Sequence, residues 1–193
     1  LVNMAGDVVH EWDLAGTPGN YGYLLPNGNL LVATKAEGGP KGFLNGGLIQ
    51  ELDWDGNLVW EYLDPNQHHD FRRLPNGNTI YLGWEPLPPE LAAQITGGIP
   101  GSEKDGVMGD YIREVTPAGE TAWEWHARDH VDFAKYPLGH GAKRHEYAHP
   151  NTIFPLDDGN ILLCFRHTDV IAILDKATGK FSWERHEADW GGP

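Results

Sequence analysis

The chain has 193 residues, with 14 Lys and Arg against 28 Asp and Glu, and its net charge is −14 with neutral histidines. This balance excludes a general nucleic-acid binder, because phosphate contacts need many Lys and Arg, and it disfavours binding to an anionic membrane. Cys164 is the only cysteine, which excludes an internal disulfide and a cysteine-based metal site. No apolar run has the length of a membrane span, and the composition leaves the compartment open.

Two phrases recur along the chain. Leu-Pro-Asn-Gly-Asn occupies residues 25–29 and 74–78, and Leu-Asp-Asp-Gly-Asn occupies 156–160. Asn-Gly and Asp-Gly dipeptides supply the positive φ that two-residue hairpin turns require, and β-rich runs flank each of them. An aromatic residue beside a glutamate also recurs, at Glu11, Glu61, Glu124 and Glu184. The chain therefore repeats a unit of two hairpins.

Four antiparallel strands that repeat every 50 to 60 residues are typical of the blades of a β-propeller. The sequence predicts an all-β propeller rather than a sandwich of hairpins, with its parts in this order: a lone last strand at 7–14, a blade at 21–63, a blade at 68–127 that contains an inserted loop at 85–108, and a blade at 145–187. Three blades and one strand cannot close a ring, and open blades expose apolar faces. We expect the remaining blades to come from the rest of a longer chain or from another chain.

Two of the predicted blades begin with histidines. The second begins His68-His69-Asp70, and the third begins with a run that contains His145, Tyr147 and His149. The first strand of each blade lines the central channel, so these residues are expected to lie close together. Imidazole can act as a base, acid, nucleophile or metal ligand near neutral pH. The candidate catalytic residues are His68, His69 and His149, and the candidate substrate-binding residues are His145 and Tyr147.

Arg166 follows the apolar run 161–165, which is predicted to pair with the strand that starts at His149. A guanidinium at the end of a buried strand needs an anionic partner. That partner is either a carboxylate of the chain, which would make Arg166 structural, or an anionic ligand that the guanidinium clamps. The recurring Trp-Glu phrase, in contrast, is predicted to serve packing between blades.

These motifs resemble the bacterial arylsulfate sulfotransferase family over roughly residues 7–187. The resemblance rests on Trp60-Glu61-Tyr62, on the His-His-Asp-Phe run at 68–71, on the turn phrase at 74–80, and on His149-Pro150-Asn151 with Arg166. It implies a six-bladed propeller, an exported protein, and small aryl sulfate and phenolic substrates. It also implies that a histidine takes the sulfuryl group from an aryl sulfate and passes it to a phenol, without a nucleotide sulfate donor or any redox cofactor.

The resemblance assigns roles residue by residue. His68 or His69 corresponds to a histidine at the rim of the channel, and His149 and Asn151 match a His-any-Asn element. Arg166 matches the arginine that follows this element. Their implied role is to bind the sulfuryl oxygens and to stabilise the charge that develops there. The nucleophilic histidine of the family lies in a later blade, so the resemblance places no nucleophile in this chain, although His149 could substitute for it.

The sequence is also compatible with two other classes of function. Copper or zinc could bind at His68, His69 and His149, because these residues offer three imidazole nitrogens. The chain could also be a non-catalytic propeller that serves as a binding scaffold, because a fold does not determine a function. Metal analysis and alanine substitution of the candidate residues would distinguish these alternatives from a sulfotransferase.

Overall fold

The computed structural model describes residues 1–43, 46–103 and 106–186. Three antiparallel sheets of four strands each form most of it, and in each sheet the strands follow one another in chain order. The first sheet contains β1 (Pro18–Leu24), β2 (Leu30–Lys35), β3 (Gly47–Leu52) and β4 (Leu58–Leu63). The second contains β5 (Gln67–Arg73), β6 (Thr79–Pro86), β8 (Met108–Val115) and β9 (Thr121–His126). The third contains β11 (Pro150–Pro155), β12 (Ile161–Phe165), β13 (Val170–Asp175) and β14 (Lys180–His186).

The turn phrases close the first hairpin of each sheet. Gly28, Gly77 and Gly159 have φ of +88°, +88° and +85°, a region that L-residues with a side chain rarely adopt. In the first two turns the asparagine after the glycine also donates a side-chain hydrogen bond to the third strand, from Asn29 to Glu51 and from Asn78 to Glu114. The phrase therefore fixes both the turn and its link to the neighbouring strand.

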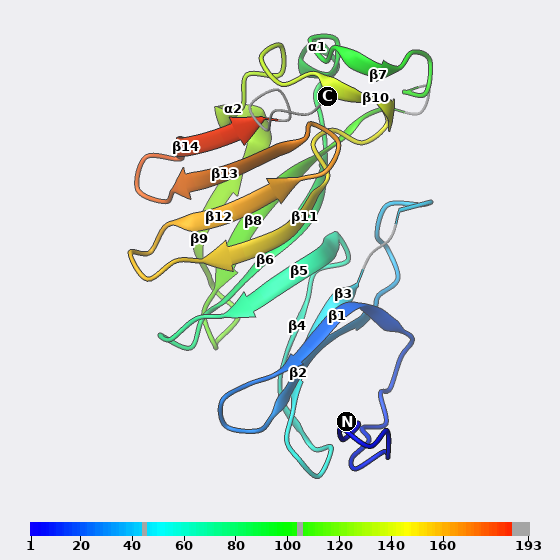
Figure 1. Ribbon diagram of the computed structural model, residues 1–193, viewed down its shortest axis with the longest axis vertical. Coiled ribbons are helices and arrows are strands. Elements are labelled where there is room, and N and C mark those ends of the chain that lie inside the picture. Colours follow the sequence, from blue (N-terminus) through cyan, green and yellow to red (C-terminus); the bar gives the residue numbers. More distant parts are fainter. Residues whose placement is uncertain (44–45, 104–105, 187–193) are drawn as a thin grey trace.

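The first strands of the three sheets lie next to one another, with β5 between β1 and β11 (Figure 1). One apolar core lies between the first and second sheets and includes Phe71 and Tyr81. A larger core lies between the second and third sheets and includes Trp125 and Leu163. The described residues form no closed ring of sheets. Because β5 lies beside β11, the residues at which these two strands begin lie close together.

Indole groups connect each sheet to the next. Trp60 in β4 donates a hydrogen bond of 3.0 Å to the Pro117 carbonyl in the β8–β9 turn. Trp125 in β9 donates one of 2.9 Å to the Gly179 carbonyl in the β13–β14 turn. The aromatic residues of the recurring phrase thus connect neighbouring sheets, through Trp60 before Glu61 in one case and Trp125 after Glu124 in the other.

The segment 7–14 was expected to be a last strand, but the structure shows no paired strand there. Within it only Val8 forms a bridge, and its partner is Val2. Trp12 nevertheless donates a hydrogen bond of 2.9 Å to the Asp53 carbonyl in the β3–β4 turn. Trp12 therefore makes the same kind of contact as the indoles of β4 and β9, although the segment 7–14 does not pair with a neighbouring strand.

The insertion between β6 and β8 contains the short helix α1 (Pro89–Ala92) and strand β7 (Gly97–Ile99). Strand β7 pairs in parallel with β10 (Leu138–Lys143), which lies in the connection between the second and third sheets after helix α2 (Ala127–His130). This small sheet lies beside one end of the third sheet (Figure 1). Both helices of the described parts of the chain are only one turn long, so neither could cross a bilayer.

Candidate active site

Irregular backbone marks the places where β5 and β11 begin. The pairing of β5 with β6 shifts register between His68 and Phe71, and the pairing of β11 with β12 shifts between Pro150 and Thr152. His69, Ala148 and His149 have φ of +48°, +65° and +53°. Such backbone is strained for residues with a side chain, and bulges and strain are frequent at functional sites. Here they turn His69 and His149 toward each other.

His68 is fully buried and faces the protein interior. Its ring stacks on Trp84 at a centroid distance of 3.8 Å, and its Nε2 lies 3.3 Å from Oδ1 of Asp110. Burial, together with the nearby rings of His69 and His149, holds the pKa of His68 well below its usual value. His68 can therefore support the neighbouring histidine but has no open face for a substrate.

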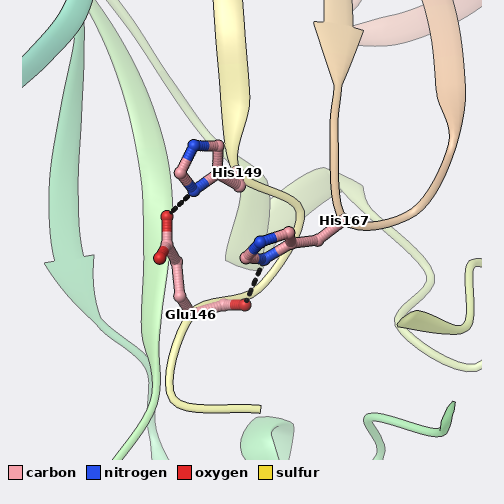
Figure 2. A group of neighbouring side chains, drawn as sticks. All are labelled: Glu146, His149 and His167. Atoms are coloured by element: carbon pink, nitrogen blue, oxygen red, sulfur yellow. Dashed lines mark hydrogen bonds and ion pairs between the residues drawn. The ribbon is translucent and has the colours of Figure 1, made fainter. Parts of the chain in front are cut away.

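His69 connects His68 to His149. Its Nδ1 lies 2.9 Å from Nδ1 of His68, and its Nε2 lies 3.1 Å from Nε2 of His149. Burial and the proximity of His149 lower the pKa of His69 to about 4, so that its ring is neutral at pH 7. The other ring nitrogen of His149, Nδ1, forms an ion pair with Glu146 (Figure 2). The three histidines thus form a continuous row.

Carboxylates lie at both ends of this row. At one end Asp110 is 1% exposed, and burial, with the charges of Glu146 and Glu85, raises its pKa well above the usual value. At the other end Glu146 is 7% exposed. The row therefore runs from one buried carboxyl group to another through three imidazoles, and such networks hold their rings in fixed orientations.

His167, which no sequence motif marks, also belongs to the cluster. It lies in the turn between β12 and β13, and its Nδ1 is 3.2 Å from the backbone carbonyl of Glu146. Its ring centroid is 4.7 Å from that of His149. Burial is the main cause of its lowered pKa. The only signal in the sequence was its position directly after Arg166.

Arg166 and Asn151 lie on the exposed side of the same strand pair. Both side chains are exposed and line a hollow of about 430 Å³ together with Cys164 and Asp169. The backbone N–H of Arg166 donates a 3.0 Å hydrogen bond to the His149 carbonyl. Among the described residues, none forms a hydrogen bond or ion pair with its guanidinium. The structural ion pair considered for Arg166 is therefore not present in the described parts of the chain.

The two candidate substrate-binding residues lie elsewhere. Tyr147 is 0% exposed, packs on Phe133 and donates a 3.0 Å hydrogen bond to the Tyr136 carbonyl, so its hydroxyl is not open to a substrate. The positive φ of Ala148 and His149 interrupts the alternation of side chains before β11 begins, so Tyr147 enters the core while His149 faces the cluster. His145 contacts the ring of Phe43 and lines a different hollow of about 730 Å³.

The histidines considered for copper or zinc do not converge on one point. His69 faces His68 with one ring nitrogen and His149 with the other, so the three rings form a row rather than a cage. The described residues that offer closely spaced metal-binding atoms are instead Glu146, His149 and His167. Of the original three histidines, only His149 belongs to this set.

The fold and the site together define an all-β protein of four-stranded antiparallel sheets with an imidazole-rich cluster where their first strands meet. The sequence matches the family model described as Arylsulfotransferase (ASST) over residues 25–190, and the chain belongs to this family. A solved protein of unknown function from Bacteroides caccae is similar at 16% identity with a TM-score of 0.49. The match covers 93% of this chain and 50% of that one, so the chain spans about half the length of that structure. No curated protein gave a significant match.

Proposed function

We propose that this chain supplies part of the active site of an aryl sulfotransferase, in which its three sheets are blades of a β-propeller. The observation that carries the proposal is the exposed guanidinium of Arg166, which has no hydrogen-bond or ion-pair partner among the described residues and whose charge acts on His69 of the cluster. Arginine and imidazole donors suit the oxygens of a transferred sulfuryl group, where negative charge develops. Membership of the arylsulfotransferase family supports the same chemistry.

The proposed reaction has two balanced steps. A histidine nitrogen attacks the sulfur of an aryl sulfate with its lone pair, so that an N–S bond forms, the S–O bond to the ring breaks and the phenolate leaves and takes up a proton. An acceptor phenol then attacks the same sulfur and loses its proton, and the N–S bond breaks to restore the imidazole. Splitting the transfer in this way replaces one difficult step with two easier ones.

We infer different roles for the residues of the cluster within this proposal. The sulfuryl oxygens would be bound by His69, His149 and the guanidinium of Arg166. Asn151, which is exposed and lines the same hollow as Arg166, would be a further donor. His68 is a positioning residue, because it is fully buried and contacts His69 but no open space. Its stacking on Trp84 and its contact with Asp110 fix the ring that orients His69.

The proposal is tested by incubating the full-length protein with 4-nitrophenyl sulfate and phenol and measuring the release of 4-nitrophenol. We expect phenol-dependent release, and we expect Arg166→Ala to lower kcat/KM by about 10²- to 10³-fold, the range for loss of one donor to a developing oxyanion. Arg185→Ala, on the outermost strand of the same sheet, is the matched control and should retain the wild-type rate. Absence of release would overturn the proposal and favour a non-catalytic scaffold, and equal rates for the two variants would overturn the role proposed for Arg166.

A propeller also requires more blades than the described residues contain. The first sheet leaves Leu58, Val59 and Leu63 at 52%, 54% and 60% exposure. We therefore propose that further blades, from the same polypeptide or from a second chain, cover such faces and complete the ring around the inner ends of β1, β5 and β11.

A further inference from the structure

Three side chains offer metal-binding atoms at one point beside the start of β11. They are Glu146, His149 and His167, and one donor atom from each lies within 4.8 Å of the other two. Figure 2 shows the two rings and the carboxylate turned toward a common space. Two imidazoles and one carboxylate form a donor set that binds zinc, and also iron(II), in proteins.

Glu146 and His149, the two donors that precede β11, have few partners other than each other. Glu146 and His149 are each 7% exposed, and they face each other as an ion pair. Oε1 of Glu146 and Nδ1 of His149 are the two atoms of that ion pair, and among the described residues neither has a further partner. A cation bound by both atoms would replace their contact with each other.

The third donor is held in the orientation that a ligand needs. The backbone carbonyl of Glu146 can only accept a hydrogen bond, so Nδ1 of His167 must carry the proton of that 3.2 Å contact. Nε2 of His167 then keeps its lone pair. Metal-binding histidines commonly donate their second ring nitrogen to a carbonyl in this way, which fixes both the tautomer and the ring.

The backbone also brings the two segments together before any ligand binds. Ala148 and His149 both have positive φ, which folds Glu146 back toward His149. The N–H of His167 donates a 3.0 Å hydrogen bond to the Ala148 carbonyl, and the N–H of Arg166 donates one to the His149 carbonyl. The strained residues and the turn of the third sheet therefore hold all three donors in place, as a preformed site requires.

We propose that Glu146, His149 and His167 bind one divalent transition-metal ion. This site lies beyond the proposed sulfuryl transfer and does not rest on it, although the two share His149. Three protein ligands leave at least one coordination position for water or for an anion. The charge of Arg166, next to His167 in the chain, acts on the His167 ring and would favour an anion as the additional ligand.

Zinc and cobalt(II) are the probes that test this site. The purified protein is first treated with a chelator, then dialysed against Zn²⁺, and its bound zinc is measured by elemental analysis. We expect one zinc per chain. We expect His167→Ala to weaken zinc binding by more than about 100-fold, which exceeds the usual cost of losing an outer-shell partner. Cobalt(II) should give the visible absorption of a low-symmetry complex, and His167→Ala should abolish it.

The control is His140→Ala, because His140 is an exposed histidine of the same connection outside the donor set. It should retain full zinc binding. Glu146→Gln, which keeps the size of the side chain, provides a second variant, and circular dichroism confirms that each variant is folded. Absence of stoichiometric zinc, or equal affinity in the wild type and in folded His167→Ala, would overturn the proposal. Metal affinity is measured without substrate, so these outcomes are independent of sulfotransferase activity.

Discussion

Asp70 is a buried carboxylate whose hydrogen bonds join β5 to β11 directly behind the histidine cluster. Its Oδ2 accepts hydrogen bonds from the Thr152 hydroxyl at 2.7 Å and from the Ile153 N–H at 3.0 Å, and it forms an ion pair with Arg72. It is 4% exposed. The aspartate of the His-His-Asp run is therefore structural, because it holds the strands that position His69 and His149.

Replacement of this carboxylate should be costly for the fold. Asp70→Ala would leave the Ile153 N–H without its acceptor and the Arg72 guanidinium without its carboxylate, so we expect the free energy of unfolding to fall by about 3–5 kcal/mol. Asp157→Ala, in the exposed β11–β12 turn, should change it by less than about 0.5 kcal/mol. Urea titration followed by circular dichroism measures both values. Similar stability of the two variants would contradict this role.

Cys164 can report on the environment of Arg166, because both residues line the same hollow. Burial, and then the charge of Asp169, raises the pKa of the Cys164 thiol above its usual value. Only the thiolate reacts, so alkylation by iodoacetamide at about pH 8 should be slower than for an ordinary thiol and should accelerate as the pH rises. Asp169→Asn removes the negative charge and should increase the rate at a fixed pH.

Asp157→Asn is the control for that change of charge, because it lies in the turn at the far end of β11 and β12. It should leave the alkylation rate of Cys164 unchanged. If Asp169→Asn and Asp157→Asn gave the same rate, the inferred influence of Asp169 on the thiol would be wrong. The rates are measured by mass spectrometry of the intact chain.

At the scale of elements, hydrogen bonds from indole groups to turn carbonyls recur between neighbouring sheets. Trp125 is 1% exposed, and its Nε1 reaches the Gly179 carbonyl of the third sheet. Trp125→Phe removes that donor and leaves a cavity, so we expect a loss of about 2–4 kcal/mol in the free energy of unfolding. Thermal or urea unfolding measures it.

Trp183 offers a matched comparison, because it occupies the corresponding strand of the third sheet but is 46% exposed. Trp183→Phe should cost less than about 0.5 kcal/mol. Equal losses for Trp125→Phe and Trp183→Phe would mean that the contact between sheets contributes little to stability.

The same repeat explains why the elements were predictable. Asn27-Gly28, Asn76-Gly77 and Asp158-Gly159 define their turns through local backbone preferences, and a local rule can be read from a local sequence. All three turns lie where the sequence places them. The segment 7–14 is not paired in the structure, because pairing depends on a neighbouring strand, whereas the contact of Trp12 needs only a carbonyl within reach.

The cluster was predictable only in part, because its details depend on packing and on backbone strain. The repeat placed His68, His69 and His149 at strand starts, and the structure brings these starts together. Alternation along the strand could not be applied at Tyr147, because Ala148 and His149 have positive φ and the strand begins only at Pro150. His167 was missed because it lies in a turn that no repeated phrase marks.

At the scale of the whole molecule, three sheets with adjacent first strands leave exposed apolar side chains on the first sheet. If further blades cover such faces, the isolated 193-residue chain should associate, and light scattering after size exclusion should give a mass above that of the 21.4 kDa chain. A stable monomer that shows no concentration dependence would contradict the proposed need for further blades.

We propose that a sulfuryl group passes through a histidine where the first strands of these sheets meet. The most direct test of this proposal is to incubate the full-length protein with an aryl sulfate but no acceptor, digest it, and search for sulfurylated peptides by mass spectrometry. We expect one sulfuryl group on a histidine nitrogen, which disappears when phenol is added and does not form in Arg166→Ala. Turnover of aryl sulfate and phenol without any sulfurylated histidine would contradict it.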